Sequence, residues 1–240
     1  MLIPENKQFD IWSDELSIPI PAIDIVIFTI YQNELCVVLL KQESEGKSSY
    51  ILPGGIIAKG FSLEENFDNI LERKTGITGV YKEQLYTFGA PGRDKRGHTI
   101  SISYFALVGM SQFLQNVDLT KIAIVKYKEL TPQNVGFKEK KIGTDHYEII
   151  QYAKQRLEWK LEYTNVVKEI LPSQFKMSQL QAMYEVIIGK KYDKRNFQKK
   201  IFSLKILKET GKFDTSTNRP AKLYEFIDSE LKIVEKNSFV

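Results

Sequence analysis

The chain has 240 residues, 42% hydrophobic and 27% charged, a balance typical of a globular protein and a length that suits two domains. No apolar run approaches the roughly 18 residues of a membrane helix, and the N-terminus lacks the basic-then-apolar order of a signal peptide. We therefore expect a cytoplasmic protein without membrane contact, and the single cysteine, Cys36, excludes an internal disulfide.

The net charge of +4 is distributed unevenly along the chain. Residues 1–172 carry a net charge of −2, whereas residues 173–226 carry 12 Lys and Arg against 5 Asp and Glu, a net charge of +7. A mildly acidic body followed by a compact basic module predicts that the C-terminal part binds a polyanion. Composition alone does not say which polyanion this is.

The first 160 residues contain sequence patterns typical of both strands and helices. A helix is expected from near Ser62, where Ser62 and Glu65 form a capping box, to Gly76, and a second helix at residues 145–162. Strands are expected, in chain order, at residues 22–31, 35–41, 84–90, 99–108 and 121–127. This order of elements predicts a mixed α/β sandwich.

The C-terminal part has a different pattern. Residues 177–188 form an amphipathic helix that Gly189 ends, and after a short turn Asp193 is a suitable N-cap for a basic helix at 193–207. A loop rich in Gly, Thr, Ser and Pro and an apolar strand follow at 208–227. Helix, turn, basic helix and β-wing together predict a winged helix-turn-helix.

Residues 53–77 resemble the Nudix box, a pyrophosphatase motif with the pattern G-x5-E-x7-R-E-U-x-E-E-x-G-U, where U is aliphatic. Gly55, Leu71, Gly76 and Ile77 match and fix the register. The charged positions of the motif then fall on Phe61, Asn69, Ile70, Arg73 and Lys74. Nudix chemistry needs helix carboxylates to hold Mg²⁺ against a diphosphate. Two cations at the final Glu pair predict that the chain has no catalytic residue, no metal ligand and no cofactor.

The loop at residues 89–99 is similar to that of Nudix proteins that handle ADP-ribose. Arg93 and Arg96 suit a diphosphate, because guanidinium groups pair bidentately with phosphate oxygens. The alternative is a solvated turn in which Arg93 pairs locally with Asp94. We interpret His146, at the start of the 145–162 helix, as structural. The expected ligand contacts are Gly55, Arg93, Arg96 and His98.

The C-terminal segment completes a resemblance to one family. Residues 171–201, with the ETG at 209–211 and the NRPAKLY at 218–224, closely resemble the winged helix of the Nudix-related transcriptional regulators (NrtR-like proteins). The resemblance implies a Nudix-like mixed α/β/α sandwich at residues 1–158 and a winged helix-turn-helix domain at residues 159–240. It also implies a homodimer that reads two operator half-sites and controls NAD metabolism or sugar catabolism.

The basic helix supports DNA binding independently. Its polar side chains lie away from the apolar stripe of Phe197, Ile201 and Leu204; Arg reads guanine, Asn and Gln read adenine, and Lys neutralises phosphates. The expected DNA contacts are Lys194, Arg195, Asn196, Gln198, Lys199, Lys205, Arg219 and Lys222. The alternative is a basic face that contacts only solvent.

These patterns predict a transcriptional regulator, expected to act as a repressor. Its non-catalytic Nudix-like domain senses ADP-ribose, or a pentose or related sugar, and its winged helix binds double-stranded operator DNA. The first alternative is a Mg²⁺-dependent pyrophosphatase for ADP-ribose-like nucleotides, with a displaced metal site on Glu65, Asp68 and Glu72. The second is a DNA-binding or scaffolding protein whose sensor domain has no ligand.

Overall fold

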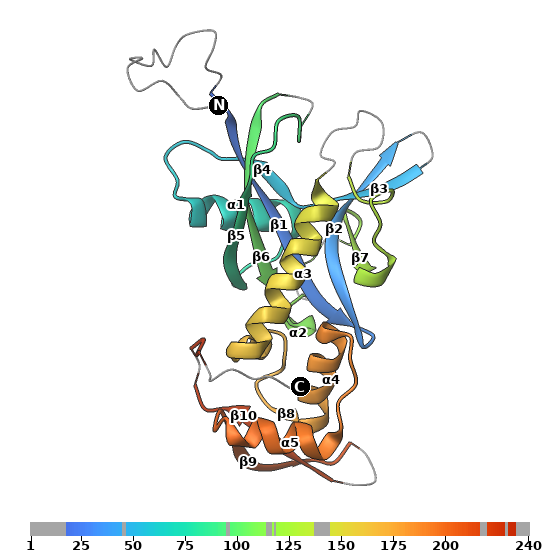
Figure 1. Ribbon diagram of the computed structural model, residues 1–240, viewed down its shortest axis with the longest axis vertical. Helices are drawn as coiled ribbons and strands as arrows, with labels where there is room; N and C mark the ends of the chain where they lie inside the picture. Colours follow the sequence, from blue (N-terminus) through green and yellow to red (C-terminus); the bar gives the residue numbers. More distant parts are fainter. Residues whose placement is uncertain are drawn as a thin grey trace, which may run out of the picture.

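The computed structural model describes residues 18–44, 47–94, 97–113, 117, 119–136, 145–216, 220–228 and 230–233. They form a body built around a large sheet and, at its lower end in Figure 1, a smaller C-terminal domain. Within these residues no helix has the length and apolar character to cross a membrane.

The body contains most of the elements. Its strands are β1 (Ile20–Tyr31), β2 (Glu34–Ser44), β3 (Lys47–Ile51), β4 (Gly54–Ile56), β5 (Tyr81–Phe88), β6 (Thr99–Leu107) and β7 (Ile122–Lys126). Its helices are α1 (Leu63–Thr75), α2 (Met110–Phe113) and α3 (His146–Tyr163), with 3-10 turns η1 (Tyr127–Glu129) and η2 (Val166–Glu169). The C-terminal domain comprises β8 (Phe175–Lys176), α4 (Met177–Ile188), α5 (Lys194–Ser203), β9 (Leu207–Asp214) and β10 (Ala221–Phe226).

Strand β1 lies at the centre of the body. It pairs in parallel with β6 along one edge, and antiparallel with β2 and β4 along the other. Alternate side chains of a strand point to opposite faces, so Ile23 and Ile25 join the core under α1, whereas Val26 and Phe28 join the core under α3. The two helices cover opposite faces of the sheet (Figure 1), and the predicted α/β/α sandwich is confirmed.

The expected ends of α1 are confirmed. Ser62 Oγ accepts a hydrogen bond from the Glu65 amide at 3.1 Å, the Glu65 carboxylate accepts one from the Ser62 amide at 2.7 Å, and Gly76 takes a left-handed φ of 77°. Strands β3 and β4 were not predicted, because Ser, Gly and Pro around them weaken the strand signal. Pairing with β2 and β1 supplies their backbone hydrogen bonds.

The second helix of the winged domain is shorter than predicted. It ends at Ser203 rather than residue 207, and Lys205 takes a φ of 53°, which an α-helix does not allow. The chain then enters β9, which pairs antiparallel with β10 to form the wing. The sequence predicts a loop for most of this first wing strand, because Lys, Glu, Gly and Asp, which are depleted in strands, make up most of it.

One hydrophobic core joins the body to the C-terminal domain. The buried side chains of α3, among them Leu157 and Leu161, belong to the same cluster as Leu180 and Tyr184 of α4 and Phe197 of α5. The two-domain division stays a prediction. Helix α3 continues to Tyr163, so a boundary after residue 158 would fall inside this helix.

Gly54 allows β4 to lie against β1. A Cβ atom here would lie 2.6 Å from both the backbone oxygen of Ile23 and Oδ1 of Asp24. We expect Gly54→Ala to lower the free energy of unfolding by about 1–3 kcal/mol through overpacking, measured by urea denaturation. Gly97→Ala is the matched control, because a Cβ there meets no heavy atom within 4 Å. Wild-type stability in Gly54→Ala would contradict this account.

Candidate functional site

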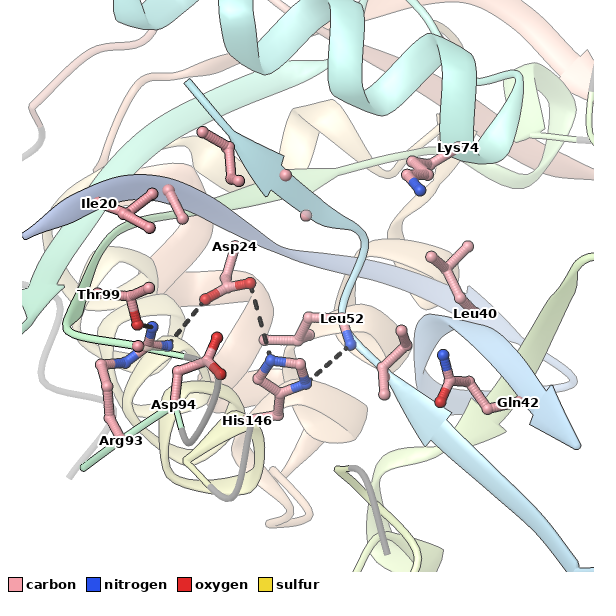
Figure 2. Close-up of a pocket in the computed structure, with 16 residues that line it drawn as sticks. Ile20, Asp24, Leu40, Gln42, Leu52, Lys74, Arg93, Asp94, Thr99 and His146 are labelled. Carbon is pink, nitrogen blue, oxygen red and sulfur yellow. Dashed lines mark hydrogen bonds and ion pairs between the residues drawn. The ribbon is translucent and has the colours of Figure 1, made fainter. Parts of the chain in front are cut away.

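A cavity of about 390 Å³ lies where β1 begins. This volume falls within the roughly 300–1,000 Å³ that is usual for small-molecule sites. Strands β1, β2 and β4, helix α1, the loop before β6 and the start of α3 all contribute to its wall. Its polar lining residues are Asp24, Gln42, Lys74, Arg93, Asp94, Thr99 and His146 (Figure 2).

Arg93 is buried and held by two carboxylates from distant parts of the chain. Its Nε and Nη2 donate to Asp145 at 2.6 and 3.1 Å, and Nη2 also donates to Asp24 at 3.0 Å. Burial alone would lower the pKa of Arg93, but the hydrogen bonds and charges of Asp145 and Asp24 outweigh it and raise the pKa. Arg93 therefore stays charged and joins β1, the loop before β6 and the start of α3.

His146 lies on the other side of Asp24. Its Nδ1 accepts a hydrogen bond from the Leu52 amide at 3.3 Å, which leaves the proton of the neutral ring on Nε2. Nε2 lies 3.7 Å from Oδ1 of Asp24 (Figure 2). These contacts fit the structural role that the sequence suggested for His146, because they attach the first turn of α3 to β1 and to the segment between β3 and β4.

The structure brings some of the predicted ligand contacts together. Gly55 and Arg93 line the cavity, whereas His98 is exposed and is not one of the described residues that line it. Arg96 lies outside the described residues. Sequence reasoning missed Asp24, although an Asp inside the apolar run of residues 22–31 is a usable signal, because a buried carboxylate needs a partner.

The lining does not fit the divalent metal that Nudix pyrophosphatases use. The Glu65 carboxylate caps α1 by accepting from the Ser62 amide, and Asp68 pairs with Lys82 at 2.6 Å. Across the part of the chain that the structure describes, no three His, Cys, Asp or Glu side chains are grouped to hold a metal. The α1 side chain that reaches the cavity is Lys74, which is a cation.

Helix α5 presents a basic surface in the C-terminal domain. Asp193 caps it by accepting from the Asn196 amide at 2.9 Å, as predicted. Phe197 is buried against Tyr184, with ring centroids 5.4 Å apart. This packing turns the polar side chains outward. The exposed members of the predicted DNA-contact set are Lys194, Arg195, Asn196, Lys199, Lys205 and Lys222.

The remaining two members of that set are not exposed or not described: Gln198 is half-buried, and Arg219 lies outside the described residues. Lys222, on the wing, is exposed but pairs with Glu209 at 2.9 Å. The turn between α4 and α5 is fixed by Glu185, whose carboxylate accepts from Lys191 at 2.7 Å and from the Tyr192 amide at 3.1 Å. Chiefly through the Lys191 hydrogen bond, these contacts lower the pKa of Glu185 to about 2.

We expect Arg93→Met to lower the free energy of unfolding by about 3–5 kcal/mol, because it leaves Asp24 and Asp145 without their counter-charge in a buried site. Chemical denaturation measures the change. Arg156→Met is the matched control: its guanidinium also pairs with a carboxylate, Glu83, at 3.3 Å, but it is more exposed. Equal losses in the two variants would show that burial adds nothing to the Arg93 ion pairs.

Comparison with known proteins finds matches to both parts of the chain. Residues 167–226 match the NrtR DNA-binding winged helix domain. The ADPR responsive transcriptional repressor NtrR of Acinetobacter baylyi is 29% identical over 214 residues, which cover 87% of this chain and 82% of the repressor.

Solved structures agree. Shewanella oneidensis NrtR, crystallised with a 27mer DNA, superposes with a TM-score of 0.72 at 28% identity, covering 85% of this chain and 92% of that one. A MutT/nudix family protein from Enterococcus faecalis shares the fold, with a TM-score of 0.66 at 22% identity and coverage of 89% and 88%. Together these likenesses show that the chain is NrtR-like: its C-terminal part is similar to the NrtR winged helix domain, and the part before it has the fold of Nudix proteins.

Proposed function

We propose that the chain is a DNA-binding transcriptional repressor whose Nudix-like domain binds ADP-ribose. The observation that carries this proposal is the pairing of an NrtR-type winged helix with a small-molecule cavity in one continuous structure. Relatives with the same two-part organisation include an ADP-ribose-responsive repressor and a protein crystallised on DNA. A homodimer that reads two half-sites is part of the proposal.

The proposal treats the Nudix-like domain as a sensor without catalysis. Lys74 lies where the sequence motif of Nudix pyrophosphatases has a metal-binding Glu, and the neighbouring position is Arg73. Two of the acidic residues on α1, Glu65 and Asp68, are engaged by Ser62 and Lys82. A ligand that is bound and not cleaved keeps the signal intact, which suits a repressor better than an enzyme.

The route from ligand to DNA runs along α3 in this proposal. The first turn of α3 belongs to the cavity through His146 and to Arg93 through Asp145. Its last turns share a core with α4, which packs against α5. The 18 residues of α3 span about 27 Å. A small rotation of this helix at the cavity therefore moves the support of the DNA-reading helix.

We expect Lys199→Ala to weaken binding to all duplexes alike and to reduce the slope of log affinity against log salt by about 1, because it removes a phosphate contact. Arg195→Ala is expected to cost about 1–3 kcal/mol and to relax specificity at one base pair. Fluorescence anisotropy on duplexes selected from a random-sequence pool measures both changes. Lys59→Ala, an exposed lysine of the Nudix-like domain, is the control. Unchanged DNA binding in both α5 variants would show that the DNA-binding surface does not lie on α5.

ADP-ribose titrated into the protein–DNA complex is expected to release the duplex, with a change of affinity of about 5- to 150-fold. Chromatography of the same mixture, with Mg²⁺ or Mn²⁺ present, should recover the ADP-ribose uncleaved. A response to a pentose alone would assign the effector to the sugar. Turnover on the order of 1 per second or faster would instead favour the pyrophosphatase alternative.

A further inference from the structure

Among the described residues, two cationic side chains line the cavity, Arg93 and Lys74, and they differ in whether they already have hydrogen-bond partners. Arg93 already donates to Asp24, Asp145 and, at 3.4 Å, to Thr99. Lys74 is half-buried, lines the same cavity, and has no hydrogen bond or ion pair with any described residue. An anionic ligand therefore meets a free ammonium at Lys74 and a guanidinium already neutralised at Arg93.

The position of Lys74 follows from the helix that carries it. Residues four apart share a helix face, so Lys74 lies one turn beyond Ile70, which packs against β4. A Cβ atom at Gly55 would lie 3.4 Å from the Ile70 side chain and 3.8 Å from Nη2 of Arg73. Because Gly55 has no side chain, the space between β4 and the last turn of α1 stays open. Figure 2 shows Lys74 on the α1 side of the cavity, away from the Arg93 cluster.

We propose that the Lys74 ammonium binds the diphosphate of the ligand in place of the metal that Nudix pyrophosphatases use. An ammonium supplies positive charge and three N–H donors. It does not lower the pKa of a bound water to near 7, as a catalytic metal does. The same substitution that removes a metal-binding carboxylate thus supplies the counter-charge for binding. This inference rests on the proposed function, because the proposed ligand, ADP-ribose, carries a diphosphate.

The opposite side of the cavity fixes which way the ligand lies. Asp24 and Asp94 are buried there, and their carboxylates accept hydrogen bonds from hydroxyl groups but repel phosphate. The diphosphate consequently faces α1, and a hydroxyl-bearing sugar faces β1 and the loop before β6. A free pentose would use only the second region, and its affinity would not depend on Lys74.

Isothermal titration calorimetry of the full-length protein tests this assignment, with ADP-ribose and inorganic pyrophosphate as probes. We expect Lys74→Met, which keeps the apolar stem, to bind both probes about 10- to 100-fold more weakly, the loss typical of a hydrogen bond to a charged group. Lys74→Arg should recover most of the affinity, and Lys59→Met should not differ from wild type. Wild-type affinity for ADP-ribose should be the same in EDTA and in excess Mg²⁺. Melting temperatures show whether each variant is folded, and Lys74→Gln replaces Lys74→Met if the latter unfolds.

The outcomes separate this inference from the proposed function. If wild-type protein binds ADP-ribose and releases DNA while Lys74→Met and Lys74→Gln bind equally well, the Lys74 assignment is overturned and the repressor stands. If only pyrophosphate binds, and binds through Lys74, the site is supported and ADP-ribose is not the effector. Binding that requires Mg²⁺ overturns the replacement of the metal. If wild-type protein binds neither probe, the diphosphate site and the ADP-ribose effector are both overturned.

Discussion

The buried ion pairs of Arg93 are the interaction on which the rest of the structure depends. Three segments separated by more than 50 residues, β1, the loop before β6 and the start of α3, meet at this one guanidinium. Removing two carboxylates and a guanidinium from water is costly, and only their mutual pairing offsets that cost. The side of the cavity next to Arg93 is therefore held in place by the fold itself, and a ligand on that side must fit around charges that are already paired.

Much of the fold could be predicted because its signals are local. The β-branched, apolar run of β1, the capping box at Ser62, the left-handed Gly76 and the Asp193 cap are each contained within a few residues, and the structure has them all. Strands β3, β4 and β9 could not be predicted, because their residues have little strand preference of their own. They are strands because β1, β2 and β10 offer them unpaired backbone groups.

The candidate site was harder to predict than the fold, and for a physical reason. The sequence identifies Arg93 as a guanidinium suited to phosphate, but only tertiary structure brings Asp24 and Asp145 within hydrogen-bonding distance of it. Residues 24 and 145 share no sequence pattern with residue 93. The basic side chains of α5 were accessible to sequence reasoning, because an apolar stripe of a short helix determines which residues face solvent.

The continuous core beneath α3 has a consequence for how the protein can change during evolution. Leu161, Leu180 and Phe197 belong to a single buried cluster, so the Nudix-like body and the winged helix share one core. A substitution in this shared core alters both parts at once, and a different body would need a surface that matches α4. The specificity of the cavity for a ligand can therefore change more readily through its wall residues than through an exchange of whole domains.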